Sequence, residues 1–288
     1  MRGKYVRYIL KAETTIALVT SDLTNSESTV SYDSVADAYE RRIGQWSRLY
    51  IPSLLAAAHI EYSDSILDVA TGTGEVLSHV KQLIEFGGKI YGCDISIPML
   101  RIAKEHSGIN ILAAMDASEL AFRDCSFDSV TCQLGLMFFP NRKKSLSEFY
   151  RVLRKSGRMA ACVWSSEERT PFVSIFPDVM SDFVSVSRDV LADGTSLGDE
   201  NMLETLVSGA GFKDIQVRVE RHTFQFPSFE EYWEPIEAGG SPTAELYVDL
   251  PRNVKKKVRE KVKLRMSPYF AGDCLNLDTE ALIVSGQK

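Results

Sequence analysis

The sequence predicts an α/β fold with a mostly parallel sheet, and three observations lead to it. From about residue 64, short apolar runs alternate with helical patterns. The first apolar run ends in a turn with two closely spaced glycines, Gly72 and Gly74, and a helical pattern follows. The run over 127–139 is too apolar on both faces for an edge strand, so we expect helices on both faces of the sheet.

Seven strands and several helices are expected in chain order. The predicted strands cover 65–70, 87–96, 109–117, 127–139, 158–164, 213–226 and 279–288. The predicted helices cover 74–86, 98–106, 143–154, 171–191 and 199–212, followed by a helical and loop pattern over 227–270.

This pattern predicts one domain over 31–288 with helical cap insertions at about 167–198 and 226–275. Residues 1–30 are expected to form a mobile N-terminal lead-in, because their later part is polar. No apolar run approaches the roughly 18 to 20 residues that cross a bilayer. We therefore expect no stable membrane insertion, and no cleavable signal peptide is evident.

Composition narrows the function classes. The formal net charge of −6 argues against a nucleic-acid binder. The five cysteines are scattered without a C-x-x-C pair, which predicts reduced thiols and a cytoplasmic location. No cluster has metal-ligand spacing, so no metal is predicted. The composition leaves a homodimer open.

The glycine turn predicts a ligand site. Gly72 and Gly74 allow the backbone to approach a ligand, and the following helix offers free N–H groups. Glu75 and Val76 stand where a P-loop needs Lys-Ser/Thr, which argues against a nucleoside triphosphate. Leu77 stands at the third glycine of the dinucleotide fingerprint, so that fingerprint is incomplete.

Two acidic residues refine the ligand class. Asp94 ends the second predicted strand, where a carboxylate can accept from two ribose hydroxyls. Nicotinamide and adenosyl cofactors share this feature, so Asp94 does not separate them. Asp68 lies on the strand just before the turn, a poor place for an acid beside a pyrophosphate but a suitable one for orienting an ammonium group. Both features suit S-adenosylmethionine, which carries an ammonium and a sulfonium and no phosphate.

Ordered motifs strengthen this interpretation. "LDVATGTG", "YGCDISIPML", "MDASEL" and "FDSVTCQLGLMFFPN" resemble the class I S-adenosylmethionine-dependent methyltransferases, in particular the small-molecule branch with the ubiquinone/menaquinone biosynthesis C-methyltransferases. The resemblance covers about residues 30–220, and the terminal "ALIVSGQK" fits the family's last strand. It implies a Rossmann-like fold. The chain departs from the family at Ala70, where the first glycine of the motif usually stands.

The resemblance also implies roles for individual residues. The methionine moiety of the cofactor would be surrounded by Asp68, Ala70, Gly72 and Gly74. Asp94 would bind the ribose, with Ile95 and Met99 beside the adenosine. Asp116 and Ala117 would face the adenine, and Gln133 and Leu134 would border the methyl group. Tyr39 and Tyr32, in a segment similar to the family's N-terminal helix, are candidate lid contacts.

Simpler interpretations exist for several of these residues. The glycines can form a plain tight turn, and Asp94 and Asp116 can each cap a helix. Tyr32 and Tyr39 can serve helix packing alone.

The expected acceptor is a small, apolar or aromatic metabolite, methylated at O, N or C. Aromatic residues follow the fourth, fifth and sixth strands, and most are expected in the core of the cap while some line the acceptor site: Phe138, Phe139, Trp164, Phe172, Phe176, Phe183, Phe224, Phe226, Phe229, Tyr232 and Trp233. Methyl transfer needs a base only when the acceptor loses a proton. No catalytic residue is identified, and His222 is a weak candidate for a base.

A second function stays open, in which the protein binds S-adenosylmethionine but performs a cyclisation, an elimination or no chemistry. The basic segment 252–266 is expected to be a solvated helix packed by valines, with contact to anionic lipid as the alternative.

Overall fold

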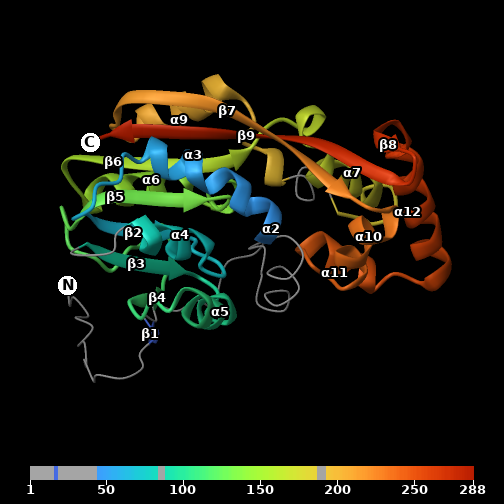
Figure 1. Ribbon diagram of the computed structural model, residues 1–288, viewed down its shortest axis with the longest axis horizontal. Coiled ribbons are helices and arrows are strands. Elements are labelled where there is room, and N and C mark those ends of the chain that lie inside the picture. The colour runs from blue at the N-terminus through green and yellow to red at the C-terminus, as the bar shows by residue number, and fades with distance from the viewer. Residues whose placement is uncertain (1–15, 19–43, 84–87, 187–192) are drawn as a thin grey trace.

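The structure is a computed structural model that describes residues 16–18, 44–83, 88–186 and 193–288. A nine-stranded sheet has the order β1-β4-β3-β2-β5-β6-β9-β7, and β8 pairs with β9 (Figure 1). The pairs from β1 to β6 are parallel, while β9 is antiparallel to its neighbours β6, β7 and β8. The strands are β1 Ile16–Leu18, β2 Ser65–Val69, β3 Lys89–Asp94, β4 Leu112–Ala114, β5 Phe127–Gln133, β6 Leu153–Trp164, β7 Lys213–Phe226, β8 Phe270–Ala271 and β9 Cys274–Gln287.

The mostly parallel α/β fold is confirmed, and the seven predicted strands are β2 to β7 and β9. The α-helices are α2 Gly44–Ser47, α3 Ile51–Ala57, α4 Glu75–Leu83, α5 Ile97–Ser107, α6 Arg142–Val152, α7 Pro171–Met180, α9 Glu200–Gly209, α10 Phe229–Glu237, α11 Pro242–Val248 and α12 Arg252–Arg265. The short 3₁₀ helices are η1 Arg48–Tyr50, η2 Leu136–Phe138, η3 Glu167–Arg169, η4 Asp193–Thr195 and η5 Ser267–Tyr269.

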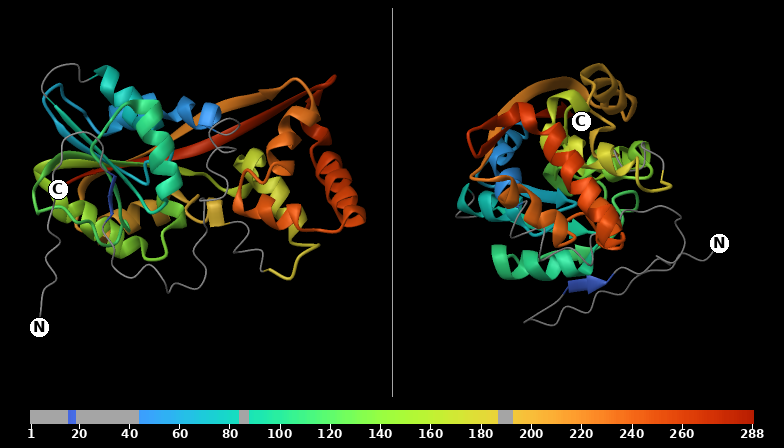
Figure 2. Two further views of the ribbon diagram at one scale, coloured as in Figure 1. Left: turned by 90° about the horizontal axis from the view of Figure 1, so that it is seen from below. Right: turned by 90° about the vertical axis from the view of Figure 1, so that its right-hand side faces the viewer.

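Helices cover both faces of the sheet. On one face α4 packs between α3 and α5, and on the other α6 packs against α9 (Figure 2). Because both faces are covered, the central strands are buried along most of their length. In β6, for example, every residue from Met159 to Trp164 is buried.

Several element boundaries differ from the predictions. β5 ends at Gln133 rather than 139, because Leu134 has a left-handed φ of +52° that turns the chain toward η2. β4 has only three residues, and α7 ends at Met180 within the predicted 171–191. β6 and β9 begin earlier than predicted, at Leu153 and Cys274, because strand pairing extends them through segments without a clear apolar pattern.

β1 was not predicted, and it lies within the expected lead-in. It pairs with β4 in parallel. The remainder of 1–30 is outside the described residues.

A second lobe is built on the far ends of β7 and β9. β6 pairs with β9 only as far as Trp164 and Ala281. Beyond that pair, β7 and β9 continue as a two-stranded ribbon from Arg221 and Glu280 to Phe226 and Leu275. The ribbon leads to α7, α10, α11, α12 and β8, which lie together to the right of the sheet in Figure 1. These elements come from the two predicted cap insertions.

An aromatic cluster forms the core of this lobe. Trp233 stacks on Phe229, with ring centroids 5.5 Å apart, and meets the edges of Phe176 and Tyr247 at 5.8 and 5.3 Å. Edge-to-face and offset contacts of this kind stabilise a core beyond the area they bury. The cluster explains how a lobe of short helices holds together.

α12 covers the lobe with its valine face, as expected. Val258 and Val262 are fully buried, whereas the basic residues lie outside them. Three of its cations pair with acids on other elements, namely Arg259 with Glu230, Lys261 with Asp182 and Arg265 with Asp178. Within the described residues, none of the helices has the length and apolarity that a bilayer crossing requires.

We expect Phe176→Ala to destabilise the protein by about 3–5 kcal/mol, because it leaves a cavity between two rings. Denaturant unfolding followed by circular dichroism measures the change. Leu264→Ala is the matched control, since Leu264 is 72% exposed on α12 and its truncation should stay within about 0.5 kcal/mol of wild type. Equal effects of the two substitutions would contradict the assignment of Phe176 to the lobe core.

Candidate functional site

The predicted site residues lie at the carboxyl ends of β2, β3, β4 and β5. The strand order reverses between β2 and β5, because β3 and β4 follow on one side of β2 while β5 and β6 lie on the other. In open α/β sheets, ligands bind at such a switch point. The fold therefore brings the residues of the four motifs to one edge.

The turn after β2 contains three left-handed residues. The φ angles are +56° at Ala70, +53° at Gly72 and +85° at Gly74. A side chain at Gly74 would meet Ala103 of α5 at 3.0 Å, so this glycine lets α5 pack against the turn. A Cβ at Gly72 would have no atom within 4 Å. The backbone at Gly72 is therefore uncovered, and its approach to a ligand stays a prediction.

Asp68 is buried at the end of β2 and is 1% exposed. Its two carboxylate oxygens accept from the Thr71 hydroxyl in the turn at 2.6 Å and from the Thr131 hydroxyl on β5 at 2.7 Å. Burial raises the pKa of Asp68 to about 7, although both hydroxyls oppose this increase. Because both oxygens are engaged, its influence on a cationic ligand is electrostatic and acts across the turn.

Asp94 connects the end of β3 to the same turn. One carboxylate oxygen accepts from the Gly72 N–H at 2.8 Å, and the other accepts from the Ser96 N–H at 2.9 Å. Each carboxylate oxygen has two lone pairs, so ribose hydroxyls can share these oxygens with the backbone. The α5 N-cap is Ser96, whose hydroxyl accepts from Met99 N–H, so Asp94 is not the side-chain cap of that helix.

The residues predicted around the adenosine lie on the side of β2 that carries β3 and β4. Ile95 is 46% exposed, and Met99 is buried on α5. Asp116 accepts from the Ser118 N–H at 2.7 Å and Ala117 is half-buried. Residues 117–119 form a turn and not the helix expected there, so Asp116 closes a turn instead of capping a helix. The contact of these site residues with adenine stays a prediction.

Gln133 and Leu134 lie on the other side of the switch point, at the end of β5. The Gln133 amide donates to the backbone oxygen of Ser47 at 2.9 Å. Its Oε1 is buried, and none of the described residues donates to it. Leu134 is 8% exposed in its left-handed conformation. A buried acceptor atom beside the glycine turn fits the ammonium group of S-adenosylmethionine.

The segment from α2 to η1 was missed by the sequence analysis. Besides the bond from Gln133 to Ser47, Arg48 forms a two-point ion pair with Glu75 at the start of α4, with both N–O distances at 2.5 Å. Arg48 and Glu75 are 27 residues apart in the sequence, and although Glu75 directly follows the glycine turn, Arg48 lies in none of the motifs identified from the sequence. This segment spans the carboxyl ends of the strands (Figure 1).

The other candidates have mixed outcomes. Tyr32 and Tyr39 lie outside the described residues. His222 lies on β7, where its ring meets Tyr50 at 4.8 Å and its Nε2 lies 3.1 Å from Glu220. Its contacts are thus with η1 and with its own strand, and its role as a base stays a prediction. No group of metal-ligating side chains occurs in the part of the chain that the structure describes.

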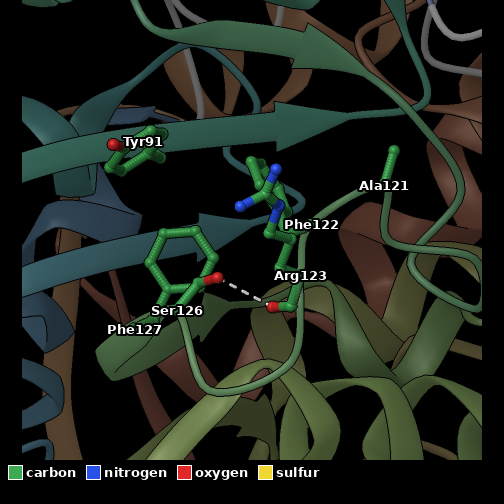
Figure 3. A pocket seen from close by; sticks show the side chains of 6 residues that line it. All are labelled: Tyr91, Ala121, Phe122, Arg123, Ser126 and Phe127. Carbon is green, nitrogen blue, oxygen red and sulfur yellow. Dashed lines mark hydrogen bonds between the residues drawn. The ribbon is translucent and has the colours of Figure 1, made fainter. Parts of the chain in front are cut away.

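Some of the predicted aromatics lie in the lobe core and some in a wall near α2, whereas Phe139 contacts Phe149 of α6. The wall consists of Trp46, Phe172, Phe224 and Phe226, which contact one another. A separate pocket lies at the amino end of β5, away from the glycine turn (Figure 3). It is lined by Tyr91, Ala121, Phe122, Arg123, Ser126 and Phe127. None of the predicted site residues lines this pocket.

Comparisons with known proteins give the family. Residues 67–161 match a family model described as a methyltransferase domain. The chain is 30% identical over 154 residues to a demethylmenaquinone methyltransferase of Streptomyces griseus, covering 52% of this chain and 65% of that protein. It is 32% identical over 171 residues to the ubiquinone/menaquinone biosynthesis C-methyltransferase UbiE of Hahella chejuensis, covering 55% of this chain and 68% of that protein. The match thus spans just under two thirds of the first relative.

Solved structures share the fold. A putative methyltransferase of Bacillus halodurans superposes with a TM-score of 0.54 at 20% identity, covering 83% of this chain and 98% of that one. Phosphoethanolamine N-methyltransferase 2 of Haemonchus contortus, in complex with S-adenosyl-L-methionine, gives 0.55 at 20% identity, covering 89% of this chain and 57% of that one.

The switch-point turn, the two carboxylates and these matches agree on one class. The chain belongs to the class I S-adenosylmethionine-dependent methyltransferases. Within that class, the chain resembles proteins named demethylmenaquinone methyltransferase and ubiquinone/menaquinone biosynthesis C-methyltransferase. The predicted family and its cofactor, S-adenosylmethionine, are confirmed.

The turn after β2, at Ala70, lies close to the turn after β5, at Gly135, and this contact can be tested by substitution. A Cβ at Gly135 would lie 2.5 Å from the Cβ of Ala70, so Gly135→Ala should destabilise the protein by about 1–3 kcal/mol. Ala70→Gly relieves a left-handed alanine, and we expect stabilisation of up to about 1 kcal/mol. The double variant should recover part of the loss in a double-mutant cycle of unfolding free energies.

Gly209→Ala provides the control for that cycle. A Cβ at Gly209, at the end of α9, would meet no atom within 4 Å, so this substitution should cause no loss. Strict additivity of Ala70→Gly and Gly135→Ala would show that the two turns are not in contact.

The second prediction concerns Asp68 and pH. The pKa of Asp68 is 3.8 in the unfolded chain and about 7 in the folded protein. At a pH between these two values, the Asp68 carboxyl has lost its proton in the unfolded chain but retains it in the folded protein. The unfolded state then binds fewer protons, so Asp68 lowers stability as pH rises from about 4 to about 7. The unfolding free energy of Asp68→Asn minus that of wild type should therefore increase as pH rises over this range, and it should level off above about pH 7. Denaturation at several pH values measures it, and a constant or falling difference would contradict the raised pKa.

Proposed function

We propose that this protein transfers a methyl group from S-adenosylmethionine to a small, apolar or aromatic acceptor at O, N or C. The observation that carries the proposal is the bond between Asp94 and the Gly72 N–H, which holds a carboxylate against the open glycine turn at the switch point. With Asp68 behind the same turn, the site is acidic. An acidic site disfavours a pyrophosphate and suits a cationic sulfonium nucleoside.

The proposed binding roles follow the positions of the residues. Asp94 accepts from the ribose hydroxyls, with Ile95 and Met99 beside the adenosine and Asp116 and Ala117 toward the adenine. Gly72, Gly74 and Ala70 leave room for the methionine moiety, and the buried Oε1 of Gln133 accepts from its ammonium. When bound, the sulfonium supplies an activated methyl group.

The protein's own contribution is positioning. Transfer from a sulfonium is an in-line displacement, so holding the acceptor in line and excluding water accounts for much of the rate. The aromatic wall of the second lobe and the clamped α2–η1 segment enclose the side from which an acceptor approaches. A dedicated base is required only for acceptors that lose a proton.

The proposal also covers the location of the protein in the cell, the extent of its domain and its partners. We place it in the cytoplasm, because all five cysteines, which lie within the described residues, are free thiols. We assign residues 31–288 to a single methyltransferase unit whose insertions bind the acceptor. Nucleic acid has no part in the proposed reaction, and a homodimer remains open.

Calorimetric titration with S-adenosylmethionine, S-adenosylhomocysteine and NAD tests the site. We expect both sulfur nucleosides to bind and NAD not to bind. Asp94→Ala should weaken S-adenosylhomocysteine binding by about tenfold to a hundredfold, the effect of losing hydrogen bonds to a charged group. Asp124→Ala is the control, because Asp124 pairs with Arg151 on the surface away from the turn.

Three outcomes are informative. Failure of both sulfur nucleosides to bind would remove the proposed function. Equal losses in the two variants would remove the role of Asp94. Binding without methyl transfer to any member of a panel of phenols, amines and enols would favour the second function, in which the cofactor is bound for other chemistry.

A further inference from the structure

One polar atom near the site lacks a role in the described structure. The indole nitrogen of Trp46 on α2 is out of contact with solvent, and none of the described residues accepts a hydrogen bond from it. Leaving a buried donor unpaired is destabilising, and buried tryptophan N–H groups usually have a partner. By contrast, the Trp233 N–H in the lobe core donates to Glu237 at 3.0 Å.

The Trp46 ring is the end of the aromatic wall. It stacks on Phe224 with ring centroids 4.8 Å apart and an interplanar angle of 24°, and it meets Phe226 at 5.1 Å. Phe224 and Phe226 alternate along the β7–β9 ribbon, so they share one face with His222. Phe172 of α7 completes the wall, 5.0 Å from Phe224.

The backbone beside Trp46 is fixed from two directions. Ser47 accepts from Gln133 at the end of β5, and Arg48 pairs with Glu75 at the start of α4. These contacts place the indole between the switch point and the second lobe. The indole of Trp46 lies on the β5 side of β2. The proposed adenosine contacts lie on the opposite side, which carries β3 and β4.

We infer that the Trp46 N–H donates a hydrogen bond to an oxygen of the methyl acceptor, which is a planar ring carrying a hydroxyl or carbonyl group. The inference rests on the proposed function, since it assigns a specificity-determining residue to the same site. An in-line displacement requires the acceptor on the side of the methyl group opposite to sulfur. In the proposed binding mode the aromatic wall lies on that side, and the inference places a flat ring beside Trp46 and Phe226 with its oxygen accepting from the buried donor.

The test compares two probes, 1-naphthol and naphthalene, by their fluorescence when titrated with protein saturated with S-adenosylhomocysteine. Wild type should bind 1-naphthol about fivefold more tightly than naphthalene, the effect of one neutral hydrogen bond. Trp46→Phe retains an aromatic ring without the N–H and should abolish that preference. Naphthalene affinity should stay within about twofold of wild type, because the ring contacts remain.

Two further variants show whether a lost preference for 1-naphthol comes from the missing Trp46 N–H itself. Trp233→Phe is the matched control, since it also removes an indole N–H but one that is paired inside the lobe core, and it should retain the preference for 1-naphthol. Replacing Trp46 by 3-benzothienylalanine exchanges only the N–H for sulfur and preserves the shape of the ring. It should reproduce the loss of preference even if Trp46→Phe fails to fold.

Calorimetry with S-adenosylhomocysteine separates this inference from the proposed function. If the cofactor product binds wild type but 1-naphthol does not, or binds no better than naphthalene, the inference is wrong and the proposed function stands. If Trp46→Phe weakens S-adenosylhomocysteine instead of 1-naphthol, the indole serves the cofactor and the inference is again wrong. If S-adenosylhomocysteine does not bind wild type, the proposed function fails first.

Discussion

The ligand edge of this protein depends on one buried carboxylate. Asp68 accepts hydroxyl hydrogen bonds from the turn that follows its own strand and from the neighbouring β5, and so joins the two sides of the switch point. The turn held in this way presents the Gly72 N–H to Asp94 on β3. A chain of short polar contacts thus fixes three adjacent strand ends before any ligand is bound.

Polar and aromatic groups occupy opposite sides of this edge. Carboxylates and backbone N–H groups lie toward β3 and β4, while aromatic rings lie toward the ribbon of β7 and β9. The ion pair of Arg48 with Glu75 and the bond from Gln133 to Ser47 hold α2 and η1 across the division. The two sides of the edge thus differ in polarity, which suits the proposed reaction between a charged donor and an apolar acceptor.

Apolar runs and the glycine motif in the sequence predicted β2, β3 and the turn between β2 and α4 well. Gly72, Gly74, Asp68 and Asp94 owe their positions to neighbours in the chain or on adjacent strands, so a motif captures them. Trp46 and Arg48 could not be found in this way, because their importance depends on contacts with Phe224 and Glu75 that only the fold brings near. The early start of β9 was missed for the same reason, since its partner β7 extends it through a polar stretch.

The second lobe is attached to the sheet through its two outermost long strands. β7 and β9 leave β6 behind at Trp164 and carry the lobe beyond the sheet on a two-stranded ribbon. None of β2, β3 and β4 extends into that ribbon. Insertions and substitutions can therefore change the lobe during evolution while the edge formed by β2, β3 and β4 is inherited unchanged.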